Sequence, residues 1–263
     1  MPVFETVLSL NIDQILGLSV VPGGNQVGSI LLRSRMALLL GYYADMLFSE
    51  RDDVFIKVVN FLIHSVALTG IEKAVALQSA DTLSTIVADT DLVPRLAPHL
   101  PSLVRTLSEC NLRITIKLYF DFVQDFVKYY HQQMVQTGCS EDIVPFVHSL
   151  VQRVLTELKA CHERGERNNL IINKCWNVIR MISELDSFMP RYASAIEEQL
   201  KPLFEYITDP SKIEFEDDIV LTIRSFIKKT NEVSPVMWAL FPMMTKVFEK
   251  NKHTFGNLLD TLN

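Results

Sequence analysis

A repeat of paired apolar helices constrains this chain more than any other feature. Segments with helical apolar periodicity begin, in pairs, near Pro2, Asp52, Asp91, Glu141, Pro190 and Pro235. These starts are 50, 39, 50, 49 and 45 residues apart. A two-helix unit that recurs every ~40–47 residues is typical of helical-repeat proteins. The sequence therefore predicts six consecutive helical hairpins.

The spacing predicts an all-α fold, a HEAT-repeat right-handed superhelical solenoid of about six hairpins. The expected hairpins span residues 2–48, 52–88, 91–131, 141–186, 190–230 and 235–263. They form one continuous array over 1–263, with no separate second domain. A single hairpin cannot bury its apolar face, so hairpins stack and offer long surfaces to partners. The pattern favours protein binding over catalysis.

Individual helices show the periodicity clearly. In the fourth hairpin one stripe is apolar and the opposite face is polar. The apolar positions are Ile143, Phe146, Val147, Leu150, Val151, Val154, Leu155 and Leu158, and the polar ones are His148, Gln152, Arg153, Glu157 and Lys159. The third hairpin has an apolar stripe at Leu112, Ile116, Tyr119, Phe120, Val123, Phe126, Val127 and Tyr130. Both stripes should face the core.

Prolines and caps mark where helices begin. Ser234 before Pro235 is a good N-cap, and proline suits the first turn of a helix. Further prolines, Pro101, Pro202 and Pro242, fall inside first helices, where each should bend or break the helix. The connections between hairpins are short except for 132–140.

Composition excludes several classes of function. The net charge is −6, which disfavours a nucleic-acid surface and mildly favours basic protein partners. Apolar runs stay short of the ~18 residues that a membrane-spanning helix needs, so no membrane insertion is expected. The first fifteen residues contain Glu5 and Asp13 and do not resemble a signal peptide. The four cysteines lack CxxC spacing and are interpreted as reduced packing thiols.

No catalytic motif is evident, so we expect no enzyme activity, cofactor or metal. The glycines of 23–28 suggest a phosphate loop only superficially, because no Lys-Ser/Thr follows them. Cys161-His162 has no second Cys/His pair close in sequence, which favours a structural thiol and a surface imidazole. His64 and His148 are single helical histidines, for which a satisfied or solvated ring is the default.

A few residues remain as candidates for binding. Arg33 and Arg35 open a second helix, where an arginine more often bridges neighbouring repeats than faces a cargo protein. The densest acidic cluster is Glu214, Glu216, Asp217 and Asp218. It is either favourable charge at a helix N-terminus or part of a surface for basic cargo, and these roles are compatible. Trp176 and Trp238 occupy apolar helix positions, which predicts that both lie in the core.

Two motifs resemble a known family. The first is Leu32-Arg33-Ser34-Arg35-Met36-Ala37-Leu38-Leu39-Leu40. The second is an acidic-aromatic segment, 213–219, followed by Val233-Ser234-Pro235-Val236-Met237-Trp238. They resemble the importin-beta superfamily of nuclear transport receptors, most closely the importin seven/eight branch. The resemblance covers about residues 30–263. The family usually has an aromatic residue in the first motif, where this chain has Met36 and Leu39, and its branch often has a longer acidic insert than 161–168.

The resemblance implies a receptor that carries protein cargo through nuclear pores under control of the Ran GTPase, and that shuttles between cytoplasm and nucleus. Cargo would bind second helices, and Phe-Gly nucleoporins would bind between first helices. The family's N-terminal Ran-binding repeats have no counterpart here, so Ran would bind a region that this chain lacks. Two alternatives stay open: an exportin of the same superfamily, which the Phe241-Pro242 helix also resembles, or a HEAT scaffold unrelated to transport.

Overall fold

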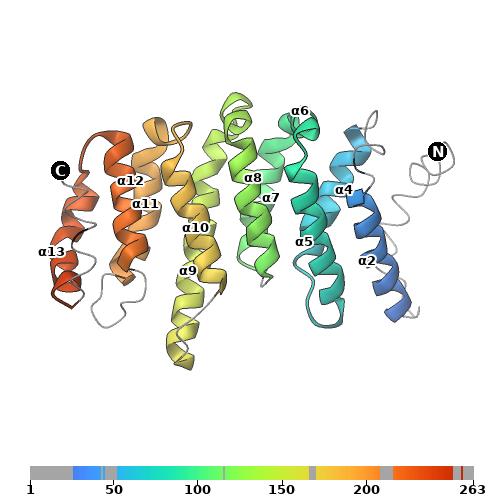
Figure 1. Cartoon of the computed structure of the whole chain (residues 1–263), viewed down its shortest axis with the longest axis horizontal. Helices are drawn as coiled ribbons and strands as arrows, with labels where there is room; N and C mark the ends of the chain where they lie inside the picture. Colours follow the sequence, from blue (N-terminus) through green and yellow to red (C-terminus); the bar gives the residue numbers. More distant parts are fainter. Residues whose placement is uncertain are drawn as a thin grey trace. The chain divides into compact units, whose positions relative to one another are not determined.

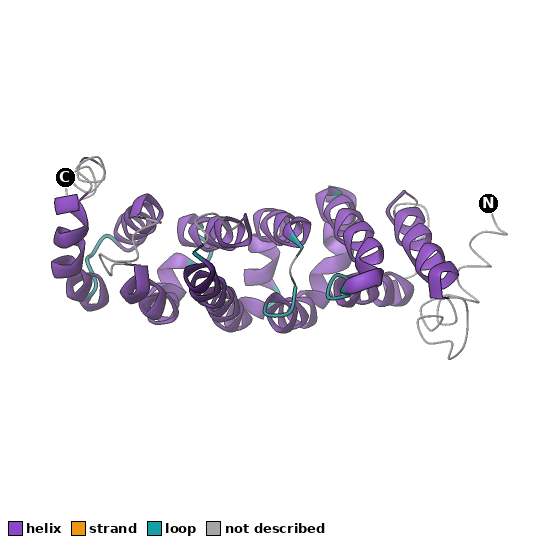
Figure 2. Cartoon of the chain, turned by 90° about the horizontal axis from the view of Figure 1, so that it is seen from below, coloured by secondary structure: helices purple, strands orange, loops and turns teal. Residues whose placement is uncertain are grey.

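The fold is all-α in the part of the chain that the structure describes. This computed structural model describes residues 26–42, 44, 52–114, 116–165, 170–207, 216–250 and 256. Within these ranges the chain forms α-helices, short 3₁₀ turns and connections, and no β-strand (Figures 1 and 2). The all-α prediction is therefore confirmed for these residues.

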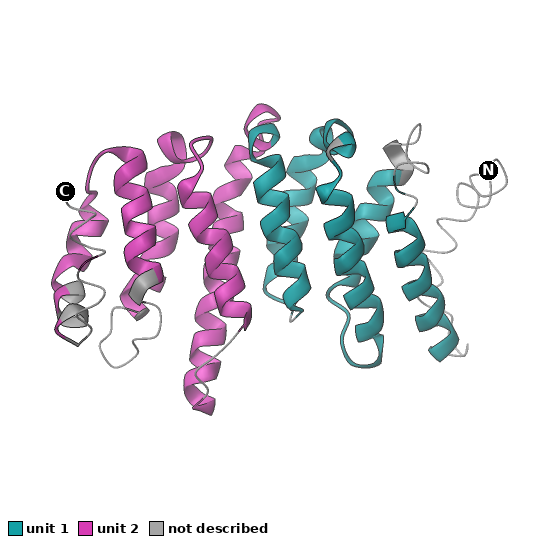
Figure 3. Cartoon of the chain, in the orientation of Figure 1, with its two compact units in different colours: residues 1–133 teal, residues 134–263 magenta. Residues whose placement is uncertain are grey.

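The chain divides into two compact units, 1–133 and 134–263 (Figure 3). The division falls near the end of helix α8 (Lys117–Gln136), so most of α8 belongs to the first unit. Each unit has its own apolar core.

Unit 1 consists of two layers of helices. Helices α2 (Gln26–Tyr42) and α5 (Lys73–Ala88) pack side by side, and α4 (Asp52–Ser65) contacts both α5 and α7 (Leu100–Asn111). Apolar side chains of α4, α5, α7 and α8 also line a common cavity of about 10 Å³, which shows that α8 closes this core. Such a volume is at the lower limit for one water, and the purely apolar lining keeps it dry.

Unit 2 has the same alternation. Its helices are α9 (Ile143–Arg164), α10 (Leu170–Glu184), α11 (Met189–Ile207), α12 (Glu216–Thr230) and α13 (Pro235–Lys250). Helix α9 packs on α10 and α11, α10 packs on α12, and α11 packs on α12 and α13. Helices α9 to α12 thus each pack on a sequence neighbour and on the helix two positions along the chain, whereas α13 packs mainly on α11.

Observed helix positions agree with most of the predicted hairpins. Helices α4 and α5 fill 52–88, α9 and α10 fill most of 141–186, and α11 and α12 fill most of 190–230. The prediction of a long connection at 132–140 is wrong. Helix α8 continues to Gln136, and a 3₁₀ turn follows at Cys139–Asp142. The first helix of the first hairpin and the second helix of the sixth lie outside the described residues.

The predicted cap is observed at Ser234, and the predicted helix breaks are observed at one of three prolines. Ser234 caps α13 as predicted, because its Oγ accepts a hydrogen bond from the Met237 N–H at 3.1 Å. The helix before α7 is broken into α6 (Val93–Leu96) and a 3₁₀ turn (Ala97–His99), and Pro101 lies in the first turn of the new helix. Pro202 and Pro242 lie inside α11 and α13, which continue through them. The predicted break therefore occurs only at the first of the three sites.

The apolar stripes are buried with one exception, and one residue of the polar face is buried too. All eight apolar positions named for the fourth hairpin are buried, as are seven of the eight in the third. Leu112 is the exception, because α7 ends at Asn111 and Leu112 lies in the exposed turn that follows. Arg153, expected on the polar face of α9, is buried.

A buried polar contact fixes α7 against α8. The Tyr119 hydroxyl, on α8, lies 3.0 Å from the Asn111 Oδ1 and 3.2 Å from the Leu107 carbonyl oxygen of α7. Both Tyr119 and Asn111 are fully buried. The Tyr119 hydroxyl therefore donates to oxygen atoms of α7 that are buried away from water.

Tyr119→Phe should lower the free energy of unfolding by about 1–3 kcal/mol, because it removes this donor and leaves buried acceptors with one partner fewer. Urea denaturation followed by circular dichroism measures the loss. Tyr129→Phe, on the exposed side of the same helix, is the matched control and should change little. Equal stability of the two variants would contradict the role assigned to Tyr119.

Candidate protein-binding surface

Large apolar side chains are exposed on one helix layer of unit 1. Helices α2, α5 and α8 are the second helices of their predicted hairpins, and each exposes such residues to solvent. They are Val27, Leu31, Leu32, Tyr42, Leu77, Leu118 and Tyr129, here called the second-helix face. Tyr42 is 76% exposed and Leu77 is 40% exposed.

The first helices of unit 1 differ in this respect. Among the described side chains of α4 and α7, none is a large hydrophobic residue that is exposed. Exposed apolar residues scattered singly are ordinary, but their concentration on one layer is more typical of a surface that a partner covers. Charged residues are interspersed on this layer, including Arg35, Asp81 and Lys128. The surface therefore suits a protein partner with both apolar and charged groups.

Polar contacts join neighbouring hairpins in unit 1. The Arg33 guanidinium of α2, which is 5% exposed, forms an ion pair with Glu72 just before α5. On the same helices, the Thr82 hydroxyl donates to the Ala37 carbonyl oxygen at 2.8 Å. Partners in the two contacts are 39 and 45 residues apart in sequence. Arg33 therefore bridges hairpins, as expected, whereas Arg35 is exposed and its binding role stays a prediction.

The described residues of unit 2 make contacts of the same kind. The Tyr192 hydroxyl lies 2.7 Å from the Ser140 Oγ, and the His148 Nδ1 lies 2.7 Å from the Gln199 Oε1. Their partners are 52 and 51 residues apart. The third contact joins the Lys229 Nζ to an Asp186 carboxylate oxygen at 2.5 Å, over 43 residues. In both units, then, polar side chains link positions about one repeat apart.

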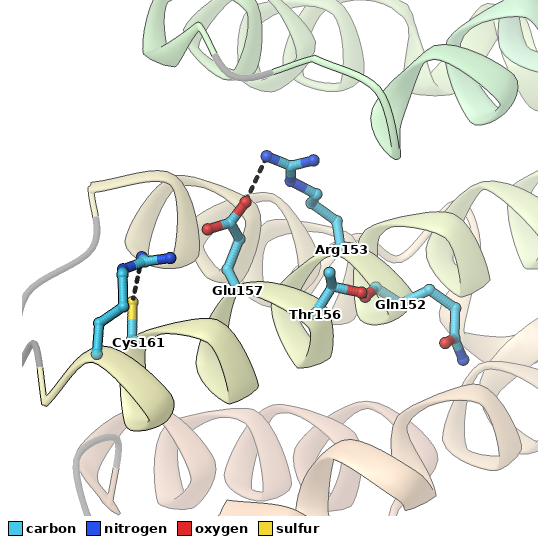
Figure 4. A network of polar contacts seen from close by, with 6 residues as sticks. Gln152, Arg153, Thr156, Glu157 and Cys161 are labelled. Carbon is cyan, nitrogen blue, oxygen red and sulfur yellow. Dashed lines mark hydrogen bonds and ion pairs between the residues drawn. The ribbon is translucent and has the colours of Figure 1, made fainter.

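Figure 4 shows the polar contacts along α9. The Arg153 guanidinium pairs with the Glu157 carboxylate one turn later, at 2.5 Å, and the Thr156 hydroxyl donates to the Gln152 carbonyl oxygen at 2.8 Å. Arg153 also lies near the fully buried Cys175 of α10, and its charge opposes the effect of burial on that thiol. Both side chains of this ion pair are largely buried, with Arg153 7% and Glu157 18% exposed.

The cysteines are free and buried, as the sequence predicted. Burial raises the pKa of the Cys110, Cys139 and Cys175 thiols, so these three stay protonated and poorly nucleophilic. Cys161 is buried while the adjacent His162 is exposed, in agreement with a structural thiol and a surface imidazole.

The predicted acidic cargo site is only partly described. Glu214 lies outside the described residues, and so do the side chains of Glu216 and Asp217. Helix α12 begins at Glu216, which places Glu216, Asp217 and Asp218 in its first turn, where negative charge is favourable. The role of the cluster in cargo binding stays a prediction.

The two tryptophans differ. Trp176 of α10 is buried, as predicted, but Trp238 of α13 is 56% exposed, so the prediction of a core position is wrong. Met237 and Leu240 are the buried residues of this turn, and Trp238 lies about 100° around the helix from Met237. Its ring lies against that of Phe241, with centroids 5.9 Å apart. Trp238 thereby becomes a candidate binding residue.

Glu197 is a buried acidic residue that the sequence did not single out. It lies on α11 and is 6% exposed, and its carboxylate accepts a hydrogen bond from the Ser234 hydroxyl at the start of α13. Burial raises the pKa of Glu197, the hydrogen bond opposes this, and the nearby charges of Glu198 and Glu232 add to the rise. Its position among the apolar residues Ile196 and Leu200 was the available signal.

A search of the described residues finds no cluster of His, Cys, Asp and Glu that could hold a metal ion. Among the helices described, none combines the length and apolar character needed to cross a bilayer. Comparison with family models, curated proteins and solved structures gives no match.

Glu72→Ala should destabilise the protein by about 1–3 kcal/mol, because it leaves the Arg33 guanidinium buried without its carboxylate. The expected loss of stability is smaller than for a fully buried ion pair, because 30% of the Glu72 side chain is exposed. Thermal unfolding measures the effect. Arg35→Ala, two residues from Arg33 on the same helix but exposed, is the control and should stay within ~0.5 kcal/mol of the wild type.

Glu197→Gln should stabilise the protein at pH 7 and have little effect near pH 4. A carboxyl group whose pKa is raised by folding binds its proton more tightly in the folded state. Its contribution is favourable below the unfolded pKa and is lost as the pH rises through the raised folded value. Melting temperatures of the wild type and of Glu197→Gln between pH 4 and pH 7 test the sign of the stability difference. The exposed Glu184→Gln is the control, and a pH-independent difference for Glu197→Gln would refute the assignment.

Proposed function

We propose that this chain is a protein-binding segment of a nuclear transport receptor, built as a HEAT-type stack of helical hairpins. The observation that carries the binding role is the second-helix face, because α2, α5 and α8 expose large apolar side chains and the described parts of α4 and α7 do not. The contacts between positions about one repeat apart support the stack in each unit. The resemblance of two motifs to the importin-beta superfamily supports the transport role.

The structure gives both motifs a physical role. In the first motif, Arg33 forms the ion pair that joins α2 to the start of the next hairpin. In the second motif, Ser234 caps α13 and its hydroxyl donates to Glu197 of the preceding hairpin. Both motifs therefore connect neighbouring hairpins. Residues that set the stacking of a solenoid also set the curvature of the surface it offers to a partner.

The proposed mechanism is binding, without a chemical step. Protein cargo would contact the second-helix face of unit 1 through its apolar residues. In unit 2, the acidic turn at Glu216, Asp217 and Asp218 is a separate candidate contact for basic groups of a cargo protein. Trp238 lies on a first helix, the layer to which the resemblance assigns Phe-Gly nucleoporins, and is the candidate contact there. The receptor would shuttle between cytoplasm and nucleus under control of Ran, which would bind a region outside this chain.

Binding of a fluorescently labelled peptide rich in Lys, Arg and Leu tests the proposal. Leu77→Gln and Leu118→Gln should each weaken binding several-fold, because each removes an exposed apolar contact. Reversing the charges of Glu216, Asp217 and Asp218 to Lys should weaken binding several-fold at low salt and less at high salt, because exposed charge pairs are screened. Fluorescence anisotropy on the full chain gives the affinities.

Matched controls separate a specific surface from general effects. His64→Gln and Ser102→Gln introduce the same amide at exposed positions of the first helices α4 and α7. Reversing Glu109, Glu141 and Glu163, which are also exposed, produces the same change in net charge elsewhere. If these variants weaken binding as much as the test variants do, the second-helix face is not the binding site.

The transport role needs the complete receptor. Addition of Ran–GTP should lower the affinity for cargo if the receptor is an importin and raise it if the receptor is an exportin. An affinity that does not respond to Ran–GTP would leave a protein-binding scaffold and refute the transport role.

A further inference from the structure

The connection between α12 and α13 contains a serine that plays no part in the proposed cargo binding. It comprises Asn231, Glu232, Val233 and Ser234, and it leads directly into Pro235. Asn231 has a positive φ of 61°, which ends α12 and turns the chain toward α13. Ser234 is partly exposed, and its neighbours Glu232 and Pro235 are exposed. A serine followed by proline thus lies at the surface, outside the helices.

The Ser234 hydroxyl makes two contacts that depend on its being an unmodified O–H group. Its oxygen accepts from the Met237 N–H, which caps α13. Its hydrogen goes to the Glu197 carboxylate, which comes from α11, the main packing partner of α13. One side chain therefore both starts α13 and attaches it to α11.

The surroundings of Glu197 are acidic. The carboxylate is nearly inaccessible to solvent, and the charged groups that act on it are Glu198 and Glu232. A further negative charge at Ser234 would thus face a buried carboxylate with two other carboxylates nearby. Like charges in a poorly solvated setting repel more strongly than they do in water.

We propose that Ser234 is a phosphorylation site for a proline-directed protein kinase, and that its phosphate weakens the docking of α13 on α11. In the reaction the Ser234 Oγ attacks the γ-phosphorus of ATP. The Oγ–P bond forms, the bond from that phosphorus to the bridging oxygen breaks, and ADP leaves with the electron pair. The hydroxyl proton passes to the base of the kinase.

The phosphate changes the two contacts differently. Its oxygens still accept a hydrogen bond from the first turn of α13, and the positive end of the helix attracts them. The contact with Glu197 is lost, because a phosphate with a charge of about −1.5 to −2 has no hydrogen to donate and repels the carboxylate. Either Glu197 takes up a proton or α13 moves away from α11. At neutral pH both routes weaken the attachment of α13 without removing its cap.

Phosphorylation of Ser234 would act locally, on the sixth hairpin. Helix α13 carries the exposed Trp238 and the half-buried Phe241, so its position sets where this apolar pair is presented. Phosphorylation would therefore alter a candidate contact surface without touching the second-helix face of unit 1.

The modification is tested on the full folded chain with ATP and a proline-directed kinase, followed by mass spectrometry of the peptides. Phosphate on Ser234 is expected, and none is expected on that peptide in Ser234→Ala. If the urea-unfolded chain is modified by a urea-tolerant kinase preparation, or the isolated peptide is modified, while the folded chain is not, the site is closed and the proposal is wrong.

The effect of the charge is tested with a matched pair, Ser234→Asp and Ser234→Asn. Both side chains are good N-caps and have nearly the same shape, so their difference reports the charge. The Asp variant should melt several degrees lower at pH 7, and hydrogen exchange should be faster in α13. Adding Glu197→Gln to both should remove most of the difference, as a double-mutant cycle requires for a direct interaction. Equal melting temperatures for Asp and Asn, or a difference that survives Glu197→Gln, would overturn the proposed repulsion.

Discussion

Burial of the apolar stripes between neighbouring helices is the constraint on which this structure depends. In unit 2, α9 presents one stripe to both α10 and α11, and α11 then presents its own to α12 and α13. A helix of this length in water gains too little from its own hydrogen bonds to be stable alone, so packing supplies most of its stability. Successive hairpins therefore stabilise one another, and an isolated hairpin would leave half of its apolar surface exposed.

Apolar packing alone leaves the register between helices weakly determined, and buried polar groups add directional contacts. Arg33 with Glu72 and Tyr119 with Asn111 each join two neighbouring elements through groups that meet at hydrogen-bond distance. A shift by one helical turn would bury these groups without partners, which is costly. We infer that these contacts determine which turn of one helix faces which turn of the next.

Periodicity in the sequence was sufficient to predict most of the described helices, because an apolar stripe on a helix identifies the residues that must leave water. It was insufficient at Trp238, Arg153 and Glu197. Trp238 is apolar but lies outside the packed face, since a helix rich in apolar residues on several sides does not show which side is covered. Arg153 and Glu197 are charged but buried, because each has a partner that lies on a different turn or a different helix. Such pairs depend on tertiary contacts that local periodicity does not contain. The candidate surface of unit 1 was likewise predicted only as a layer, since exposure of Leu77 or Leu118 depends on what packs beside them.

Contacts that reach only one or two helices along the chain also determine how this structure comes apart. In the described part of unit 2, α13 has its main contact with α11, whereas α11 contacts four other helices. Loss of α13 would expose one side of α11 and leave the packing of α9 on α10 intact. Separation of α13 from α11 would thus disrupt less packing than separation of α11 from its neighbours, so α13 can open locally while α9 stays packed on α10.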